Sequence, residues 1–223
     1  MEQEFLKVID LKEILPVVLM SLYVSLSSTL IASTLGMFIG IPCALLEFKF
    51  KKIIIQINHT LMSVPPVLMG LLVYLLLSRK GPLGEFQLLF TPTAMIIAQT
   101  LLIFPIVFGL SISIIIKNGK DIRNTCMTLG ANNTQTFFII IKENKIQLLA
   151  VITAAFGRAI SEVGAVMIVG GNIKGFTRVM TTYIALETGK GDFNEALVIG
   201  GILLAISFII NGILHFFQGS EDF

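Results

Sequence analysis

The sequence has few charged residues for its length. Asp, Glu, Lys and Arg make up only 13% of its 223 residues, and 55% are hydrophobic, whereas a soluble domain carries about 25% charged residues. The mean hydropathy is +0.89. The apolar residues lie in long blocks rather than at helical or alternating spacing, which indicates membrane spans. The composition therefore predicts an all-α integral membrane protein that is embedded in the lipid bilayer.

Several chemical signatures are also missing. Cys43 and Cys126 have no metal-site spacing and predict no disulfide framework. His59 and His215 have no acidic or cysteine neighbours at ligand spacing, so we expect no metal site and no cofactor. A net charge of +2 without a basic run argues against a nucleic-acid partner. No G-x-x-x-x-G-K-[ST] motif is present, so any ATP hydrolysis would take place in another subunit, and we expect no catalytic residue.

The apolar blocks have the length of membrane spans. A bilayer core of about 30 Å requires about 20 apolar residues in a helix. The sequence predicts five spans, at 14–46, 53–78, 92–116, 146–171 and 196–218. Residues 1–13 mix apolar side chains with acids and lysines, which is typical of a short amphipathic helix at the interface. The membrane domain would then occupy residues 14–223.

Charge alone hardly decides the orientation. The side that holds the polar segment 117–145 carries eight lysines and arginines against seven on the other side, so the positive-inside rule barely favours a cytoplasmic position for this segment. Within the first span, small residues recur every four positions and so share one helix face, which favours close packing against another helix. These residues are Ser28, Ala32, Gly36, Gly40 and Ala44.

The second span contains Pro65 and Pro66. Proline removes a backbone donor and clashes with the carbonyl four residues earlier, so the helix must kink or break here. Broken backbone at membrane depth is tolerated only against protein or water. An inert kink and a bend that lines a gate are equally compatible with this pattern.

The fourth span carries Arg158 and Glu162 inside an apolar run. Four residues apart on a helix, the two side chains can form an ion pair. They share one face with small and polar residues such as Ser161, whereas Phe156 and Ile160 lie on the opposite side, so we expect the small and polar face to point inward. Ionisable groups inside a membrane usually mark a solute pathway, although a purely structural pair remains an alternative.

Two other classes of function compete with a passage driven by a partner ATPase. A channel or ion-coupled carrier that works without ATP would also use a polar helix face, but it does not require the long polar segment 117–145. A membrane enzyme that uses Glu162 and His59 would need a nucleophile or metal constellation, which the sequence lacks. Co-purification of an ATPase would distinguish a passage that a partner ATPase drives from a channel or carrier that works without ATP.

The polar segment carries a recognisable motif. TLGA at 128–131, followed by Phe137 and Phe138, resembles the cytoplasmic coupling loop of ABC-importer permeases, where the motif is roughly E-A-A-x-x-x-G. The glycine of that motif falls on Gly130, but Asn124-Thr125-Cys126 stands in place of E-A-A, and Lys142-Glu143 stands where the family usually has Leu-Pro.

Three further segments narrow the resemblance to the molybdate, tungstate and sulfate permease group. They are VPPVLMGLLVYLLLSRKGPLG (64–84), FTPTAMIIAQTLLIFPIVFGL (90–110) and GRAISEVGAVMIVGGNIKGFTRVMTTYIALETGKGDF (157–193). The last segment looks most like the tungstate-type permease, because the molybdate branch tends to have Glu-Phe-Gly where this chain has Glu162-Val163-Gly164. Tungstate is thus the favoured anion, with molybdate and sulfate as alternatives.

The resemblance implies a type I ABC importer permease fold in the plasma membrane. Two permease copies would surround one oxyanion passage, two ATPase subunits would dock on the 117–145 loops, and an extracytoplasmic binding protein would deliver the anion to residues 79–91 and 172–194. The implied coupling residues are Asn124, Thr128, Leu129, Gly130, Ala131, Phe137 and Phe138. The candidate passage or gate residues are Pro65, Pro66, Arg158, Ser161, Glu162 and Gly164. ATPase closure would alternate access to the passage.

Overall fold

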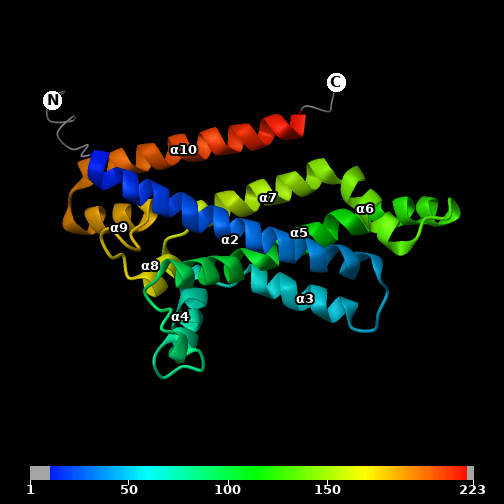
Figure 1. The fold of residues 1–223 in the computed structure, drawn as a ribbon, viewed down its shortest axis with the longest axis horizontal. Helices are drawn as coiled ribbons and strands as arrows, with labels where there is room; N and C mark the ends of the chain where they lie inside the picture. Colours follow the sequence, from blue (N-terminus) through cyan, green and yellow to red (C-terminus); the bar gives the residue numbers. More distant parts are fainter. Residues whose placement is uncertain (1–10, 220–223) are drawn as a thin grey trace.

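The computed structural model describes residues 11–219 and consists of helices joined by short turns (Figure 1). The elements are α2 (Leu11–Leu45), α3 (Lys51–Met62), α4 (Pro66–Leu77), the 3-10 turn η1 (Gly84–Phe86), α5 (Pro92–Thr128), α6 (Asn133–Glu143), α7 (Lys145–Ile160), α8 (Gly164–Gly170), α9 (Met180–Lys190) and α10 (Phe193–Gly219).

The long helices α2 and α5 form the centre of the bundle. They run in the same direction with matched register, because Ser28 donates a 2.8 Å hydrogen bond to Gln99 and a Cβ on Gly36 would lie only 2.8 Å from Val107 Cγ1. The four-residue ladder of small side chains on α2 is buried along its length. This confirms the predicted close helix packing, since small residues let two backbones approach.

The second and fourth expected spans are each two helices rather than one. The axes of α3 and α4 meet at 102°, and those of α7 and α8 at 56°. A helix of 12 residues such as α3 is about 18 Å long, which is too short to cross the bilayer core alone. Helices α2, α5 and α10 are long and apolar enough to span, and the total reaches five when each bent pair counts as one span.

The sequence predicted one continuous helix over 146–171, and this prediction is wrong. α7 ends at Ile160 and α8 begins at Gly164, so one helical face cannot run through the whole stretch. The break needs no proline here, because Glu162 and Thr181 satisfy backbone groups at the break, as described below.

The polar segment 117–145 is helical and is not the loop that the sequence suggested. α5 continues to Thr128, a turn follows at 129–132, and α6 leads into α7. The reason is local: Asn132 accepts from the backbone N–H of Gln135 at 2.8 Å, and the Gln135 side chain accepts from the Asn132 N–H at 2.9 Å. This capping box fixes the start of α6.

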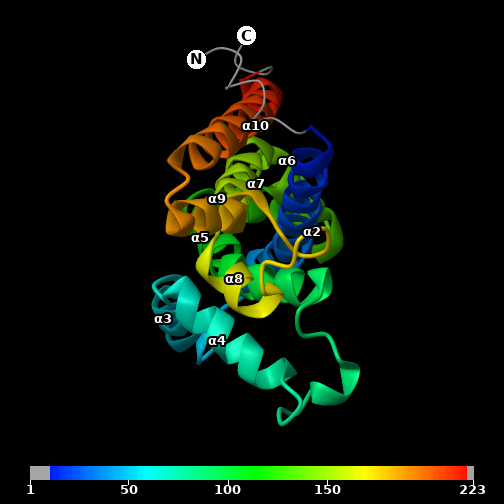
Figure 2. The same cartoon turned by 90° about the vertical axis from the view of Figure 1, so that its left-hand side faces the viewer.

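The remaining expectations concern the ends of the chain and the polar stretch 172–194. Of the expected amphipathic segment 1–13, residues 1–10 lie outside the described residues, and residues 11–13 form the first turn of α2. The polar stretch contains the short helix α9 and lies at the same end of the bundle as the start of α2 (Figures 1 and 2).

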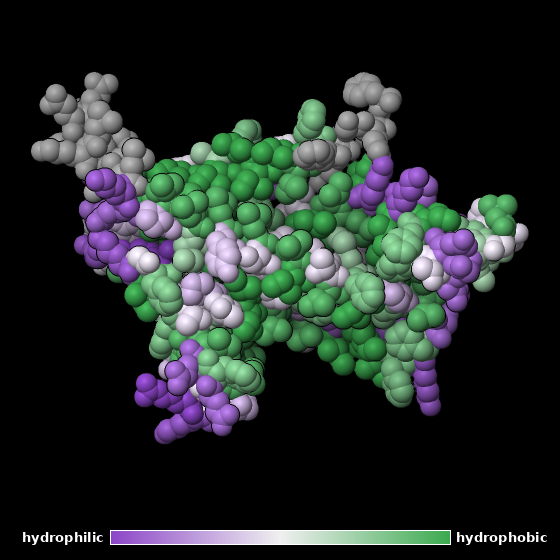
Figure 3. Space-filling model, viewed as in Figure 1, coloured by the Kyte–Doolittle hydropathy of each residue, from purple (hydrophilic) through white to green (hydrophobic). Residues whose placement is uncertain are grey.

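The surface is arranged as a membrane protein requires. Figure 3 shows hydrophobic residues across the middle of the molecule and hydrophilic residues gathered at its ends. Large apolar side chains are exposed on α10, including Leu204 at 72% and Phe208 at 81%. Exposure on this scale is stable in lipid or against another membrane helix but not in water.

Candidate functional site

The two helix breaks lie side by side. A Cβ on Gly70 of α4 would be 2.7 Å from the Ala165 Cα of α8, and a Cβ on Gly164 would be 2.7 Å from Val67 Cγ2. The glycine side of α4 therefore rests directly on the backbone of α8. Each of these two helices begins at its break, so both interruptions of the membrane backbone share one region of the protein.

Glu162 occupies the break between α7 and α8. One carboxylate oxygen accepts a 2.8 Å hydrogen bond from Arg158 Nη1, and the other accepts a 3.0 Å bond from the backbone N–H of Ala165 in the first turn of α8. The hydroxyl of Thr181 donates to the Glu162 backbone carbonyl at 2.7 Å. Glu162 thus pairs with a cation, caps α8 and is anchored to the first turn of α9.

The two partners differ in their access to solvent. The Glu162 side chain is 2% exposed, whereas that of Arg158 is 35% exposed. An isolated charge in such a place would cost several kcal/mol, and a close partner offsets this cost. The predicted ion pair is therefore present, with its acid buried in the protein and its base at the surface of the chain.

The small and polar face of α7 does not point into this chain, which corrects the sequence expectation. Ala154 and Ser161 are exposed, while Phe156 and Ile160 on the opposite side are 1% and 5% exposed. The bulky residues fill the space against the other helices of the same chain. The face that ends at Arg158 is consequently open at the surface, where a second subunit or a passage can cover it.

The two prolines lie at the other break. Pro65 is the N-cap residue of α4 and Pro66 its first helical residue, a position that proline favours because its missing N–H would have no helical partner. Pro65 is exposed and Pro66 is half-buried. The predicted break is confirmed. The bend itself does not distinguish a gate from an inert kink.

The turn between α5 and α6 displays apolar side chains at the hydrophilic end of the molecule. Leu129 is 82% exposed and Phe138 is 64% exposed. Gly130 has a φ of +81°, a conformation that a Cβ disfavours, as expected for the turn. Phe137 is half-buried and its ring lies 6.4 Å from that of Phe38 on α2. Asn124 and Thr128 are exposed, and Ala131 is half-buried.

Comparison with known proteins places this geometry in a family. Residues 32–219 match the family model described as the binding-protein-dependent transport system inner membrane component. The chain belongs to this family. It is the membrane-spanning permease of an ABC importer with the all-helical type I fold, it works with ATPase and substrate-binding partners, and ATP hydrolysis takes place in a separate subunit.

Individual relatives are similar over most of their length. The tungstate uptake system permease protein TupB of Peptoclostridium acidaminophilum is 46% identical over 92% of this chain and 90% of its own. TupB of Campylobacter jejuni is 41% identical over 76% of this chain and 71% of its own. A probable anion ABC transporter permease protein of Haloferax volcanii is 37% identical over 92% and 90%.

Sequence reasoning missed three residues that link the helices around the two breaks. Gly70 carries no signal in an apolar run, and its close contact with α8 follows only from the fold. Thr181 lies in a polar stretch with several other threonines. Gln99 accepts from Ser28 and donates a 2.9 Å bond to the Ala159 carbonyl of α7. A lone glutamine in an apolar span was the one available signal for this link between α2, α5 and α7.

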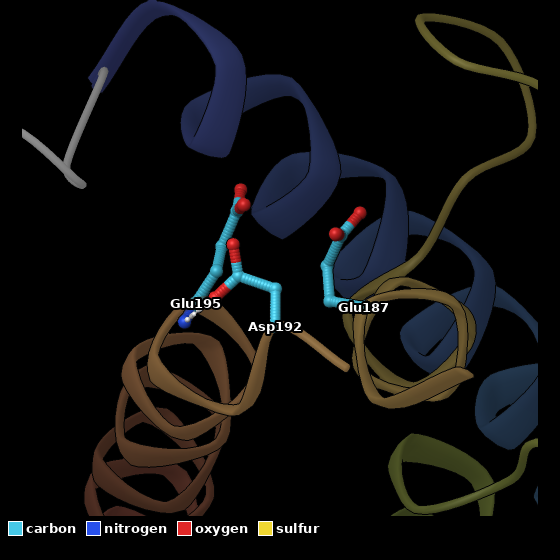
Figure 4. Close-up of side chains that lie close together, drawn as sticks. All are labelled: Glu187, Asp192 and Glu195. Carbon is cyan, nitrogen blue, oxygen red and sulfur yellow. Dashed lines mark hydrogen bonds between the residues drawn. The ribbon is translucent and has the colours of Figure 1, made fainter. Parts of the chain in front are cut away.

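Figure 4 shows three acids close together at the end of the bundle that carries α9. Oxygens of Glu187, Asp192 and Glu195 lie within 4.8 Å of one another. Each has a protein partner: Lys190 pairs with Glu187 at 2.7 Å, Asp192 accepts from the Glu195 N–H at 3.1 Å, and Tyr183 donates its hydroxyl proton to Glu195. Burial and then this hydrogen bond raise the pKa of Tyr183. Lys190 and Tyr183 thus reduce the repulsion between the carboxylates.

Proposed function

We propose that the chain is the permease of a tungstate importer and that the open face of α7, ending at Arg158 and Glu162, forms the wall of the oxyanion passage. The relatives that are 46% and 41% identical carry the name of tungstate uptake permeases, and the third is named for an anion. The observation that carries the passage is the ion pair itself, with its buried acid and half-exposed arginine at the break between α7 and α8.

A homodimer would cover this exposed face. Small side chains and a guanidinium at the surface of a membrane helix are poor contacts for lipid. A second copy of the chain that presents the same face would enclose a polar passage between the two α7 helices, because a twofold interface brings the same patch of both subunits together. The apolar surface of α10 would then face lipid.

The ion pair suits an anion that must enter and leave. An oxyanion in a low-dielectric passage loses hydration, and a fixed positive charge lowers that barrier. An unpaired arginine would hold the anion too strongly. Glu162 tempers the attraction and keeps Arg158 from being an unpaired charge while the passage is empty. As access alternates, the anion would replace the Glu162 carboxylate as the partner of the Arg158 guanidinium, and the carboxylate would return when the anion leaves.

The exposed pair Leu129 and Phe138 supports the assignment of 117–145 as the coupling segment. We infer that α6 and the preceding turn enter a cleft of the ATPase, which would bury both apolar side chains. This contact places the segment on the cytoplasmic side of the plasma membrane. Residues 79–91 and 172–194 would then face the binding protein.

Reconstituted uptake tests the passage. Arg158→Gln should slow tungstate uptake about tenfold, which corresponds to about 1.4 kcal/mol of barrier. Glu162→Gln should also change uptake at normal complex yield, and the double variant should be less defective than the sum of the two. Competition of labelled tungstate uptake by unlabelled tungstate, molybdate and sulfate measures selectivity, and unlabelled tungstate should be the strongest competitor. If complex yield alone accounts for the losses, and exchanging the two charges restores it, the pair is structural.

A second experiment tests coupling. Gly130 has no atom within 4 Å of a potential Cβ, so Gly130→Asp should fold, while its charge and strained backbone weaken ATPase binding and uncouple transport. Gly189→Asp, at an equally open position in α9, is the control and should leave ATPase co-purification unchanged. Normal substrate-stimulated ATP hydrolysis in the Gly130→Asp complex would refute the assignment. Uptake that persists without ATPase would support an ATP-independent channel or carrier instead.

A further inference from the structure

A basic pocket with an apolar floor lies at the corner where α2, α3 and α5 meet. Its volume is about 460 Å³. Four lysines from three different segments line it, together with one acid, Glu47, so its net charge is +3. These lysines are Lys49, Lys51, Lys52 and Lys120.

Two of the four lysines are already engaged. Lys51 is half-buried and donates to the carbonyls of Ala44 and Leu46 at 2.7 and 3.0 Å, and it thereby caps the end of α2. Its ammonium also lies 3.5 Å from Glu47, and Lys120 lies 3.7 Å from the same carboxylate. Glu47 therefore lies beside Lys51 and Lys120, and the net charge of +3 already includes its carboxylate.

Lys49 and Lys52 remain available. Both are exposed, and neither has a hydrogen-bond or ion-pair partner among residues 11–219. They are placed beside apolar atoms rather than on an open hydrophilic surface, because Ile55, Ile115 and Ile116 line the same pocket. A ligand that fits must offer an anionic group to the lysines and an apolar part to the isoleucines.

The position of the pocket identifies the ligand. The chain reads FKFKK at 48–52, and Phe48 and Phe50 are 39% and 59% exposed between the lysines. Ile53 and Ile57, which follow on α3, are both 54% exposed and present an apolar surface that is stable in lipid. Lysines beside exposed apolar side chains at the end of a membrane helix lie at headgroup depth, where their ammonium groups reach the interface.

We propose that this pocket binds an anionic phospholipid, with the headgroup phosphate on Lys49 and Lys52 and the glycerol and acyl region against the isoleucine floor. Basic pockets between membrane helices are suited to anionic headgroups. The turn between α2 and α3, which lines the pocket, lies at the same end of the molecule as α6 (Figure 1), so the leaflet is cytoplasmic. This last assignment rests on the proposed ATPase docking, whereas binding itself requires only a bilayer. The bound lipid would hold the α2–α3 corner against α5, where Arg123 donates to the Leu45 carbonyl at 2.8 Å.

Native mass spectrometry of the permease complex tests the proposal. The complex is reconstituted in nanodiscs of phosphatidylcholine that contain a tenth of phosphatidylglycerol, and retained phosphatidylglycerol is counted. Lys49→Gln with Lys52→Gln should weaken its binding about 30-fold, because each lysine near an anionic surface contributes about 1 kcal/mol and 1.4 kcal/mol is tenfold. Lys49→Arg with Lys52→Arg should retain the lipid.

The control removes the same charge elsewhere. Arg79→Gln with Lys80→Gln, at exposed positions after α4, should retain as much phosphatidylglycerol as the native chain. Equal loss in the control pair would show a general effect of charge and overturn the proposal. Unchanged lipid retention in Lys49→Gln with Lys52→Gln, together with lost ATPase binding in pure phosphatidylcholine, would assign the lysines to an acidic protein contact instead. Neither readout depends on tungstate transport, so failure of the transport proposal leaves this test intact.

Discussion

The two breaks in the membrane helices have different causes. Between α3 and α4 the chain turns by 102° at Pro65 and Pro66, and between α7 and α8 it turns by 56° without any proline. Conversely, α2 and α5 remain continuous although they contain Pro16, Pro42 and Pro105. Proline is therefore neither necessary nor sufficient for a break in this protein.

The break between α7 and α8 has side-chain partners for its interrupted backbone, and α4 packs against the start of α8. Glu162 supplies an acceptor for the α8 N-terminus, Thr181 supplies a donor for the carbonyl at the break, and Gly70 allows α4 to pack on α8. Backbone groups inside a membrane must be satisfied by protein or water. The comparison teaches that the break without a proline depends on groups that the surrounding fold provides. The predictions below disturb the contact between α4 and α8, remove those groups, or remove the prolines.

Separation of α4 from α8 should have the largest effect. Gly70→Leu places a side chain where even a Cβ would be 2.7 Å from the Ala165 Cα, and we expect a loss of about 3 kcal/mol in the free energy of unfolding, since backbone cannot move aside cheaply. Thermal unfolding of the purified permease measures the loss. Gly201→Leu on α10, which has no atom within 4 Å of a potential Cβ, is the control, and equal melting temperatures would contradict the packing argument.

Removal of the cap at the proline-free break should come next. Glu162→Ala loses both the ion pair and the bond to the Ala165 N–H, whereas Glu162→Gln keeps an acceptor for that bond. We expect Glu162→Ala to be less stable by about 2 kcal/mol than the native chain, because its hydrogen bonds involve a charged group. Glu162→Gln should lie between the two. If Ala and Gln variants unfold at the same temperature, the cap contributes nothing.

Loss of the anchor on the break should be smaller. Thr181→Val removes a buried hydroxyl that donates to the Glu162 carbonyl at 2.7 Å while preserving side-chain shape. The expected loss is about 1 kcal/mol, typical of one neutral hydrogen bond. Thr188→Val at an exposed site in α9 should change stability little. Proteolysis or hydrogen exchange at 160–165 would report local opening, and full protection there in Thr181→Val would argue against an anchoring role.

The prolines should contribute least to stability. With α4 held on α8 through Gly70, Pro65→Ala with Pro66→Ala should cost about 0.5 kcal/mol, mostly because the unfolded chain gains freedom. If the bend lines the passage, uptake should fall more than complex yield. Unchanged tungstate uptake at equal complex abundance would return these prolines to an inert kink.

Membrane character and the family could be predicted from the sequence. Long apolar runs have few alternatives to crossing a bilayer, and a glycine at a helix end indicates a positive φ, as Gly130 shows. The Arg158–Glu162 pair also followed from four-residue spacing, since two of the four steps between these residues lie within α7 and the break after Ile160 leaves the two groups within reach.

Tertiary structure alone decided which way the α7 face points and where the fourth span breaks. Periodicity shows that Ser161 and Arg158 lie on a different helix face from Phe156. It does not show which face packs against the rest of the chain, because both faces can be buried in an oligomer. Capping by Glu162 needed the position of Ala165 after the turn, and the contact of Gly70 with α8 needed two segments almost a hundred residues apart in sequence to meet. Local sequence patterns determine the helices. The side chains that form hydrogen bonds with the backbone groups at the helix ends are brought into place only by the fold.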